Sequence, residues 1–194
     1  MNFLAHLALS CEDPHLQMGN FLGDYTKGRT PEHYPEGVQR GIVLHRLIDA
    51  KTDAHPVTHE IADRLKHRHG RYSGVVSDVI FDLYLYRNWN SLGLPPFPGF
   101  ADRTYANLLD NLDYLDEKMV ARIHRMVDAR WLDTYTSKEG ILQVFQRMKK
   151  RFSKPQFIQG IDKTLEEEDE AFNQAFLQLF PDLQLTVTEF CDCS

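Results

Sequence analysis

The chain has 194 residues, of which 42% are hydrophobic and 26% are charged, values typical of a soluble, globular single domain. It carries 22 Lys and Arg against 28 Asp and Glu, a net charge of −6. This is the wrong sign for a general binder of nucleic acid or of anionic membranes, so we expect neither as a partner.

Apolar residues recur at intervals of three and four along most of the chain, while the alternation typical of strands is scarce. This pattern predicts an all-α fold, a single-domain helical bundle spanning residues 1–194. In chain order, helices are expected at residues 2–10, 14 toward 24, 36 to about 50, 57–69, 73 to before 92, near 100–115, 116–130 and 137–152, and about 155–179.

Local signals set several helix boundaries. Asp13 followed by Pro14 is typical of a helix start. Asp53 and Ser73 are predicted to cap the helices that follow them. The Pro/Gly-rich segment 92–99 is a candidate hinge or subdomain boundary. The C-terminal segment 185–194 is β-prone but too short to support a sheet alone.

The three cysteines, Cys11, Cys191 and Cys193, have no spacing for a four-ligand zinc site. The N-terminal apolar stretch lacks preceding basic residues, and it is too short and too interrupted for a signal peptide or a membrane span. A reducing, cytoplasmic location fits these features best.

Two predicted helices carry ionisable residues at four-residue spacing inside apolar stretches. His45 and Asp49 share one helix face, and Asp78 and Asp82 share another. Ionisable groups among aliphatic residues rarely stand without a partner. Imidazole nitrogen together with carboxylate oxygen suits Mn²⁺, Fe²⁺ or Mg²⁺ better than a structural zinc ion. The two pairs therefore predict a divalent-metal site.

His6 and Asp24, at or near the ends of two other apolar helices, are further candidate ligands. Such a metal would polarise a phosphoryl oxygen and generate hydroxide at neutral pH. A structural interpretation stays open, because acid–base pairs at this spacing are common on helix surfaces and His6 can equally be a core histidine. Five histidines in polar contexts are interpreted as solvent-facing: His15, His33, His59, His67 and His69.

Four short blocks stand out in order: MNFLAHL (1–7), GNFLGD (19–24), GIVLHRLIDAKTD (41–53) and SDVIFD (77–82). Together they resemble the acyl carrier protein phosphodiesterase family, strongly over the first ninety residues and beyond them only in length and helical character. The resemblance implies an all-α, HD-phosphohydrolase-like hydrolase that uses a divalent metal, typically Mn²⁺. The implied reaction hydrolyses the phosphodiester between 4′-phosphopantetheine and a serine of holo acyl carrier protein, in the context of fatty acid biosynthesis.

The resemblance assigns six side chains to the metal and water-activating centre: His6, Asp24, His45, Asp49, Asp78 and Asp82. No histidine in the chain directly precedes an aspartate, so the dipeptide that names the HD superfamily is absent. The division of these six among ligands, base and supporting residues is therefore open. His45, Asp49 and Asp82 are the candidate catalytic groups among them.

Phosphodiester cleavage also needs cations that stabilise developing negative charge. Arg46 and Lys27 adjoin candidate ligands, although Arg46 points about 100° away from His45 on an ideal helix. Arg87 lies five residues beyond Asp82. Ordinary solvated cations are the alternative for all three.

An acidic carrier protein should meet a basic surface. The first candidate surface comprises Arg64, Lys66, Arg68 and Arg71, and the second comprises Arg147, Lys150, Arg151 and Lys154. A solvated helix face is the alternative for both. Residues 162–170 hold six acids and one lysine, and the acidic run 166–170 is expected to face elsewhere.

Three functions follow from this sequence. The first is acyl carrier protein phosphodiesterase activity. The second is a phosphohydrolase of the same fold acting on a nucleotide or another small phosphoester, because fold and metal do not fix a substrate. The third is a non-catalytic helical interaction module.

Overall fold

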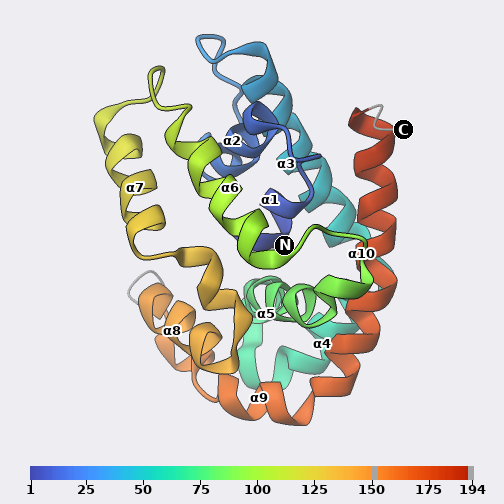
Figure 1. Ribbon diagram of the computed structural model, residues 1–194. Coiled ribbons are helices and arrows are strands. Elements are labelled where there is room, and N and C mark those ends of the chain that lie inside the picture. Colours follow the sequence, from blue (N-terminus) through green and yellow to red (C-terminus); the bar gives the residue numbers. More distant parts are fainter. Residues whose placement is uncertain (150–152, 192–194) are drawn as a thin grey trace.

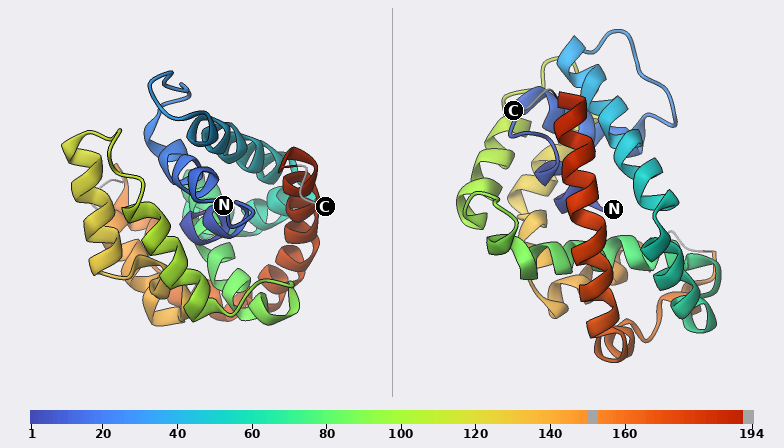
Figure 2. Two further views of the ribbon diagram at one scale, coloured as in Figure 1. Left: turned by 45° about the horizontal axis from the view of Figure 1, so that its top comes forward. Right: turned by 90° about the vertical axis from the view of Figure 1, so that its right-hand side faces the viewer.

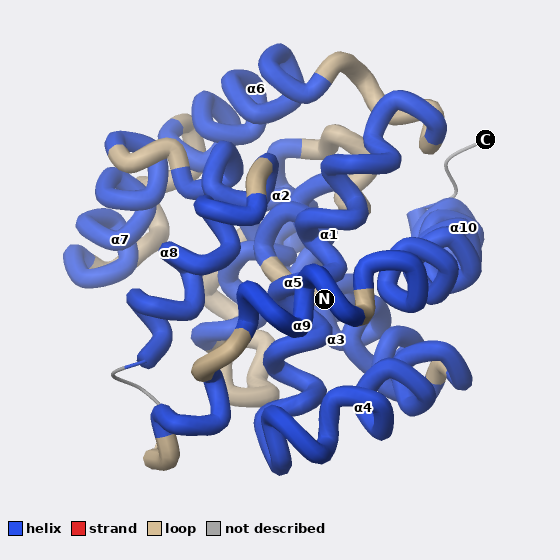
Figure 3. The backbone as a smooth tube through the Cα atoms, turned by 90° about the horizontal axis from the view of Figure 1, so that it is seen from below, coloured by secondary structure: helices blue, strands red, loops and turns tan. Residues whose placement is uncertain are grey.

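The computed structural model describes residues 1–149 and 153–191, and in this part of the chain it contains helices and loops but no strand (Figures 1 and 3). The predicted all-α fold is confirmed. The α-helices are α1 (Phe3–Ala8), α2 (Pro14–Leu22), α3 (Glu36–Ala54), α4 (Pro56–His69), α5 (Ser73–Asn88), α6 (Phe97–Leu109), α7 (Glu117–Asp128), α8 (Lys138–Met148), α9 (Ile161–Glu167) and α10 (Asp169–Cys191). Short 3-10 helices are η1 (Gly23–Tyr25), η2 (Gly70–Tyr72), η3 (Trp89–Ser91), η4 (Trp131–Thr136) and η6 (Pro155–Ile158). No helix among the described residues is long and apolar enough to cross a membrane.

Two of the predicted caps differ from the structure. Asp13 caps α2 as expected, accepting a hydrogen bond from the Leu16 N–H. Asp53 lies in the last turn of α3, and the ring of His55 caps α4 instead. Ser73 does not cap α5, because η2 continues directly into that helix and the Ser73 hydroxyl donates to the carbonyl of Gly70. The sequence misplaced these caps because neighbouring residues bond to the groups involved: His55 accepts the N–H at the start of α4, and the Gly70 carbonyl accepts the Ser73 hydroxyl.

The C-terminal region is more interrupted, and ends differently, than the sequence predicts. The single helix expected at 155–179 is wrong: η6, α9 and α10 replace it, and Gly160 starts α9 at a φ of 74°, which favours glycine. The β-prone segment from residue 185 continues α10 as far as Cys191, while Cys193 lies outside the described residues. Val187 in this segment, and Leu183 one turn before it, are buried, so packing overrides strand propensity.

Glycines let α2 and α3 touch backbone to backbone. A Cβ on Gly19 would lie 2.1 Å from the carbonyl oxygen of Val38, and one on Gly41 would lie 2.5 Å from that of Leu16. Any larger side chain would separate the two helices. This contact holds η1, which follows α2, beside the middle of α3, where the candidate ligands lie.

Helix α5 is the central element of the fold. It contacts α1, α4, α8 and α10, and most of its residues are buried. Helix α10 runs along one side of the molecule (Figures 1 and 2). The N-terminus lies in the interior of the molecule, among the other helices. Met1 is accordingly only 8% exposed. The segment 92–96 joins η3 to α6; its role as a hinge stays a prediction.

Candidate metal centre

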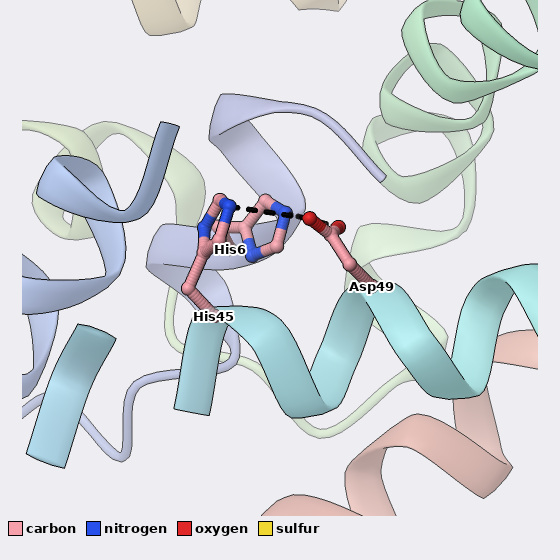
Figure 4. A group of neighbouring side chains, drawn as sticks. All are labelled: His6, His45 and Asp49. Carbon is pink, nitrogen blue, oxygen red and sulfur yellow. Dashed lines mark hydrogen bonds and ion pairs between the residues drawn. The ribbon is translucent and has the colours of Figure 1, made fainter. Parts of the chain in front are cut away.

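Three predicted site residues meet in one cluster (Figure 4). His6 comes from α1, and His45 and Asp49 come from adjacent turns of α3. His6 Nε2 lies 3.1 Å from Asp49 Oδ1, and His45 Nε2 lies 3.2 Å from Asp49 Oδ2. The two imidazole rings stack with their centroids 4.0 Å apart. One donor atom from each residue falls within 4.8 Å of the other two, which is compatible with ligation of a single ion.

Asn20 fixes the orientation of the His6 ring. Its amide nitrogen donates to the His6 carbonyl at 2.7 Å and to Ser10 Oγ at 2.9 Å, so its oxygen faces His6 Nδ1 at 2.8 Å. This network assigns the ring proton to Nδ1 and leaves the Nε2 lone pair facing the carboxylate of Asp49. Burial lowers the pKa of His6 and favours the neutral ring. In this tautomer the Nε2 lone pair and the Asp49 oxygen, 3.1 Å apart, repel each other unless a proton or a metal ion binds there, and the donor set fits a divalent metal.

His45 and Asp49 reinforce this interpretation. His45 is buried, and its Nδ1 has no hydrogen-bond partner in the described part of the chain. Burial raises the pKa of Asp49, but hydrogen bonds that the His45 and His6 rings donate when they are protonated, together with the nearby charge of the N-terminus, outweigh burial and hold that pKa below its usual range. Asp49 is therefore ionised at neutral pH.

Asp24 lies beside the triad without joining it directly. Its Oδ1 is 3.7 Å from His45 Nε2, and about half of its side chain, 48%, is exposed. Gly23 makes this arrangement feasible, because a Cβ there would lie 2.2 Å from His45 Cγ. Sequence reasoning missed the positioning roles of Gly23 and Asn20, although both fall within the GNFLGD block.

Asp78 and Asp82 both hydrogen-bond to the N-terminal segment of the chain. Asp78 Oδ1 accepts a hydrogen bond from the Met1 amino group at 3.0 Å, and that group lies 3.8 Å from Asp49 Oδ1. Asp82 is buried and accepts the backbone N–H groups of Leu4 at 2.9 Å and Ala5 at 3.2 Å. The structure therefore places Asp82 at the start of the helix that carries His6. Burial raises the pKa of Asp82 to about 7.

The three candidate cations do not converge on the triad. Arg46 donates to Thr30 Oγ1 at 3.0 Å and to a carbonyl in the loop that precedes α3. Arg87 pairs with Asp169 at 2.5 Å. Lys27 is exposed and follows η1.

Two of the four residues of the first basic surface already pair with the acidic run. Arg64 pairs with Glu168 at 2.7 Å, and Arg68 pairs with Glu167. The expectation that the acidic run 166–170 faces elsewhere is therefore wrong. Surface charges that are already paired offer less to an incoming carboxylate.

The other two residues of the first surface have different partners. Lys66 lies 4.0 Å from Asp63, and Arg71 bonds to Tyr72 and Ser153. Two members of the second surface, Lys150 and Arg151, lie outside the described residues.

One of the histidines predicted to face solvent does not. His69 is fully buried, with Nδ1 at 2.7 Å from the Phe157 carbonyl and Nε2 at 2.7 Å from Thr164 Oγ1. His15, His33, His59 and His67 are exposed as expected.

The helical fold and the cluster of two buried imidazoles and one half-exposed carboxylate define an all-α protein with a candidate divalent-metal centre. The family model "Acyl carrier protein phosphodiesterase" matches residues 1–183. Curated proteins named acyl carrier protein phosphodiesterase from Yersinia pestis and Salmonella paratyphi A are each 29% identical over 183 residues, covering 93% of this chain and 94% of theirs. No solved structure gives a significant match. The chain belongs to the acyl carrier protein phosphodiesterase family, whose name places it among phosphodiester hydrolases.

Proposed function

We propose that the protein uses a divalent metal to remove 4′-phosphopantetheine from the serine of holo acyl carrier protein. One observation supports the metal most directly: the lone pair of the buried His6 Nε2 faces the carboxylate of Asp49 across 3.1 Å. Two imidazoles and one carboxylate can hold a divalent first-row metal; the family resemblance favours Mn²⁺, with Fe²⁺ or Mg²⁺ as alternatives. The family name supports the carrier protein as substrate.

In the proposed reaction, water adds to phosphorus and the bond from phosphorus to the serine oxygen breaks. The serine oxygen takes up a proton, so the products are apo acyl carrier protein and free 4′-phosphopantetheine. A divalent cation at the triad would polarise a phosphoryl oxygen and favour ionisation of the attacking water at neutral pH.

The protein's own groups prepare this step. Asn20 orients His6 and sets its tautomer, a supporting role that commonly accompanies metal ligands. Asp82 holds the start of α1 and with it the position of His6. Asp24, partly exposed and 3.7 Å from His45 Nε2, is placed to accept a proton from the attacking water.

The decisive experiment incubates the purified protein with holo acyl carrier protein and Mn²⁺. Mass spectrometry should show loss of the phosphopantetheine mass, and the loss should stop when a chelator is added. Metal analysis of protein purified without chelator should find a bound divalent ion. Absence of both metal and activity would favour a non-catalytic helical module.

A second substrate class separates the two enzymatic functions. An unchanged carrier protein beside a hydrolysed nucleotide would replace our proposal with a phosphohydrolase of the same fold. We also propose a cytoplasmic location, supported by the cysteine pattern and by the proposed substrate.

A further inference from the structure

A cavity of about 410 Å³ lies beside the triad, within the size range of small-molecule pockets. Helices α1, α5 and α8 and the 3-10 helices η1 and η4 contribute its walls. Asp24 and Asp78 line it together with apolar side chains that include Phe3, Val79 and Trp131. Because Asp24 also lies 3.7 Å from His45 Nε2, the cavity and the candidate metal centre share a wall.

Two polar side chains in the cavity wall have no hydrogen-bonding or ionic side-chain partner in the part of the chain that the structure describes. Tyr135 is only 3% exposed, and its hydroxyl makes no hydrogen bond to another described residue. Burial, reinforced by the charges of Asp82 and Asp24, raises the pKa of Tyr135 well above its ordinary value. The phenol therefore stays protonated and can donate.

Arg147 is the second of these side chains. It is exposed, lines the same cavity and forms no ion pair within residues 1–149 and 153–191. A second guanidinium, that of Arg122, lies 4.7 Å from the ring centroid of another lining residue, Tyr25. These cations contrast with Arg64 and Arg68, which are neutralised by glutamates.

We propose that this cavity binds the 4′-phosphopantetheine arm, with Tyr135 and Arg147 contacting its phosphate oxygens and the apolar wall contacting its pantetheine chain. The inference rests on the proposed function and identifies where the substrate's prosthetic group binds. An anionic phosphate beside the carboxylates of Asp24 and Asp78 needs donors opposite them. Tyr135 and Arg147 supply a neutral and a charged donor, and the apolar wall suits an uncharged chain.

The binding test follows Trp131 fluorescence, because Trp131 lines the cavity and the other tryptophan, Trp89, is 1% exposed. The wild-type protein is titrated with 4′-phosphopantetheine, pantetheine and inorganic phosphate in the presence of a chelator, so that binding is measured without turnover. We expect saturable binding of 4′-phosphopantetheine that is tighter than binding of either fragment. Trp131→Phe should abolish the signal, and calorimetry should still detect the binding.

Variants then assign the contacts. Tyr135→Phe and Arg147→Gln should each weaken 4′-phosphopantetheine binding about tenfold, which is typical for loss of one hydrogen bond to a charged group. Arg125→Gln removes the same charge from an exposed position on α7 outside the cavity, and it should leave binding unchanged.

A steric pair tests the cavity itself. Val75 lines it and is 37% exposed, whereas Val43 is 45% exposed on α3 and does not line it. Val75→Phe should weaken binding measured by calorimetry, and Val43→Phe should not.

Several results would overturn the inference: no saturable binding, equal binding of inorganic phosphate, tighter binding of adenosine monophosphate, or unchanged affinity in both polar variants. The hydrolysis assay distinguishes a failure of the proposed activity from a failure of the proposed binding site. Carrier hydrolysis with binding indifferent to Tyr135 and Arg147 would refute only the cavity assignment. Variant-sensitive binding of the arm without hydrolysis would refute only the proposed activity.

Discussion

The protein buries histidines in two places, and the two differ in how their ring nitrogens are satisfied. At the end of α4, His69 hydrogen-bonds through both nitrogens, to the Phe157 carbonyl and to Thr164 Oγ1. In the triad, the Nε2 of His6 faces a carboxylate, and the Nδ1 of His45 has no partner among the described residues.

The difference separates a structural histidine from a ligand candidate. Burying an imidazole stabilises a fold only when its polar atoms find partners. The network around His69 is complete, so this ring ties α4 to the segment before α10. Under our proposal, the triad gains its missing interaction when a cation binds. The predictions below test this contrast, from the largest expected effect to the smallest.

Removing a triad side chain should abolish activity without unfolding the protein. His45→Ala and Asp49→Ala should each lower turnover of holo acyl carrier protein about a thousandfold or more, because a catalytic metal contributes several kcal/mol. Bound metal should fall in parallel, while the helical circular-dichroism spectrum stays intact. His59→Ala, at an exposed position on α4, is the control. Unfolding of both triad variants would instead indicate that these residues are structural.

His69→Ala should show the opposite pattern. It removes two buried hydrogen bonds and leaves a cavity, so the free energy of unfolding should drop by about 3 kcal/mol. Urea denaturation measures this loss, and metal content per folded molecule should not change. Loss of metal at unchanged stability would erase the distinction between the two histidine sites.

Asn20→Ala should weaken the metal site without removing a ligand. Loss of the acceptor for His6 Nδ1 should reduce metal affinity about 10- to 100-fold, measured by chelator competition with Mn²⁺. Asn107→Ala, which removes a half-buried asparagine bonded to Gln17 on α2, is the matched control. Equal affinity in the two variants would exclude an orienting role for Asn20.

Asp82 should make stability depend on pH. Its pKa rises on folding from its ordinary value of 3.8 to about 7, so the folded state holds a proton that the unfolded state has released between those values. Stability should therefore fall as pH rises from about 4 to about 7. Asp82→Asn should flatten this slope in urea titrations and retain metal. Loss of metal would make Asp82 a ligand, as its sequence context predicts.

The smallest effect is expected on the first basic surface. Arg64 and Arg68 are already paired with glutamates, and exposed pairs contribute little. Reversing both charges should change carrier affinity less than about fivefold at low salt. Arg147→Glu should weaken it more. A larger loss from the double reversal would establish this surface as the docking site for the carrier protein.

Several features follow from the sequence because they depend on local geometry. Helical periodicity predicts the all-α fold, and the start of α2 follows from Asp13 and Pro14. The four-residue spacing alone brings His45 and Asp49 to one face of α3, and the structure confirms that they interact.

Other features depend on contacts between distant segments, which spacing does not encode. The approach of His6 to α3 requires the glycine contact between α2 and α3 and the cap that Asp82 gives α1. The polar context of His69 gave no sign that the segment before α10 would cover it. The sequence by itself determined the all-α class and the proximity of His45 and Asp49 on α3. Only the tertiary structure decided which buried histidine completes its hydrogen bonds and which faces a carboxylate, because those partners come from elements far apart in the chain.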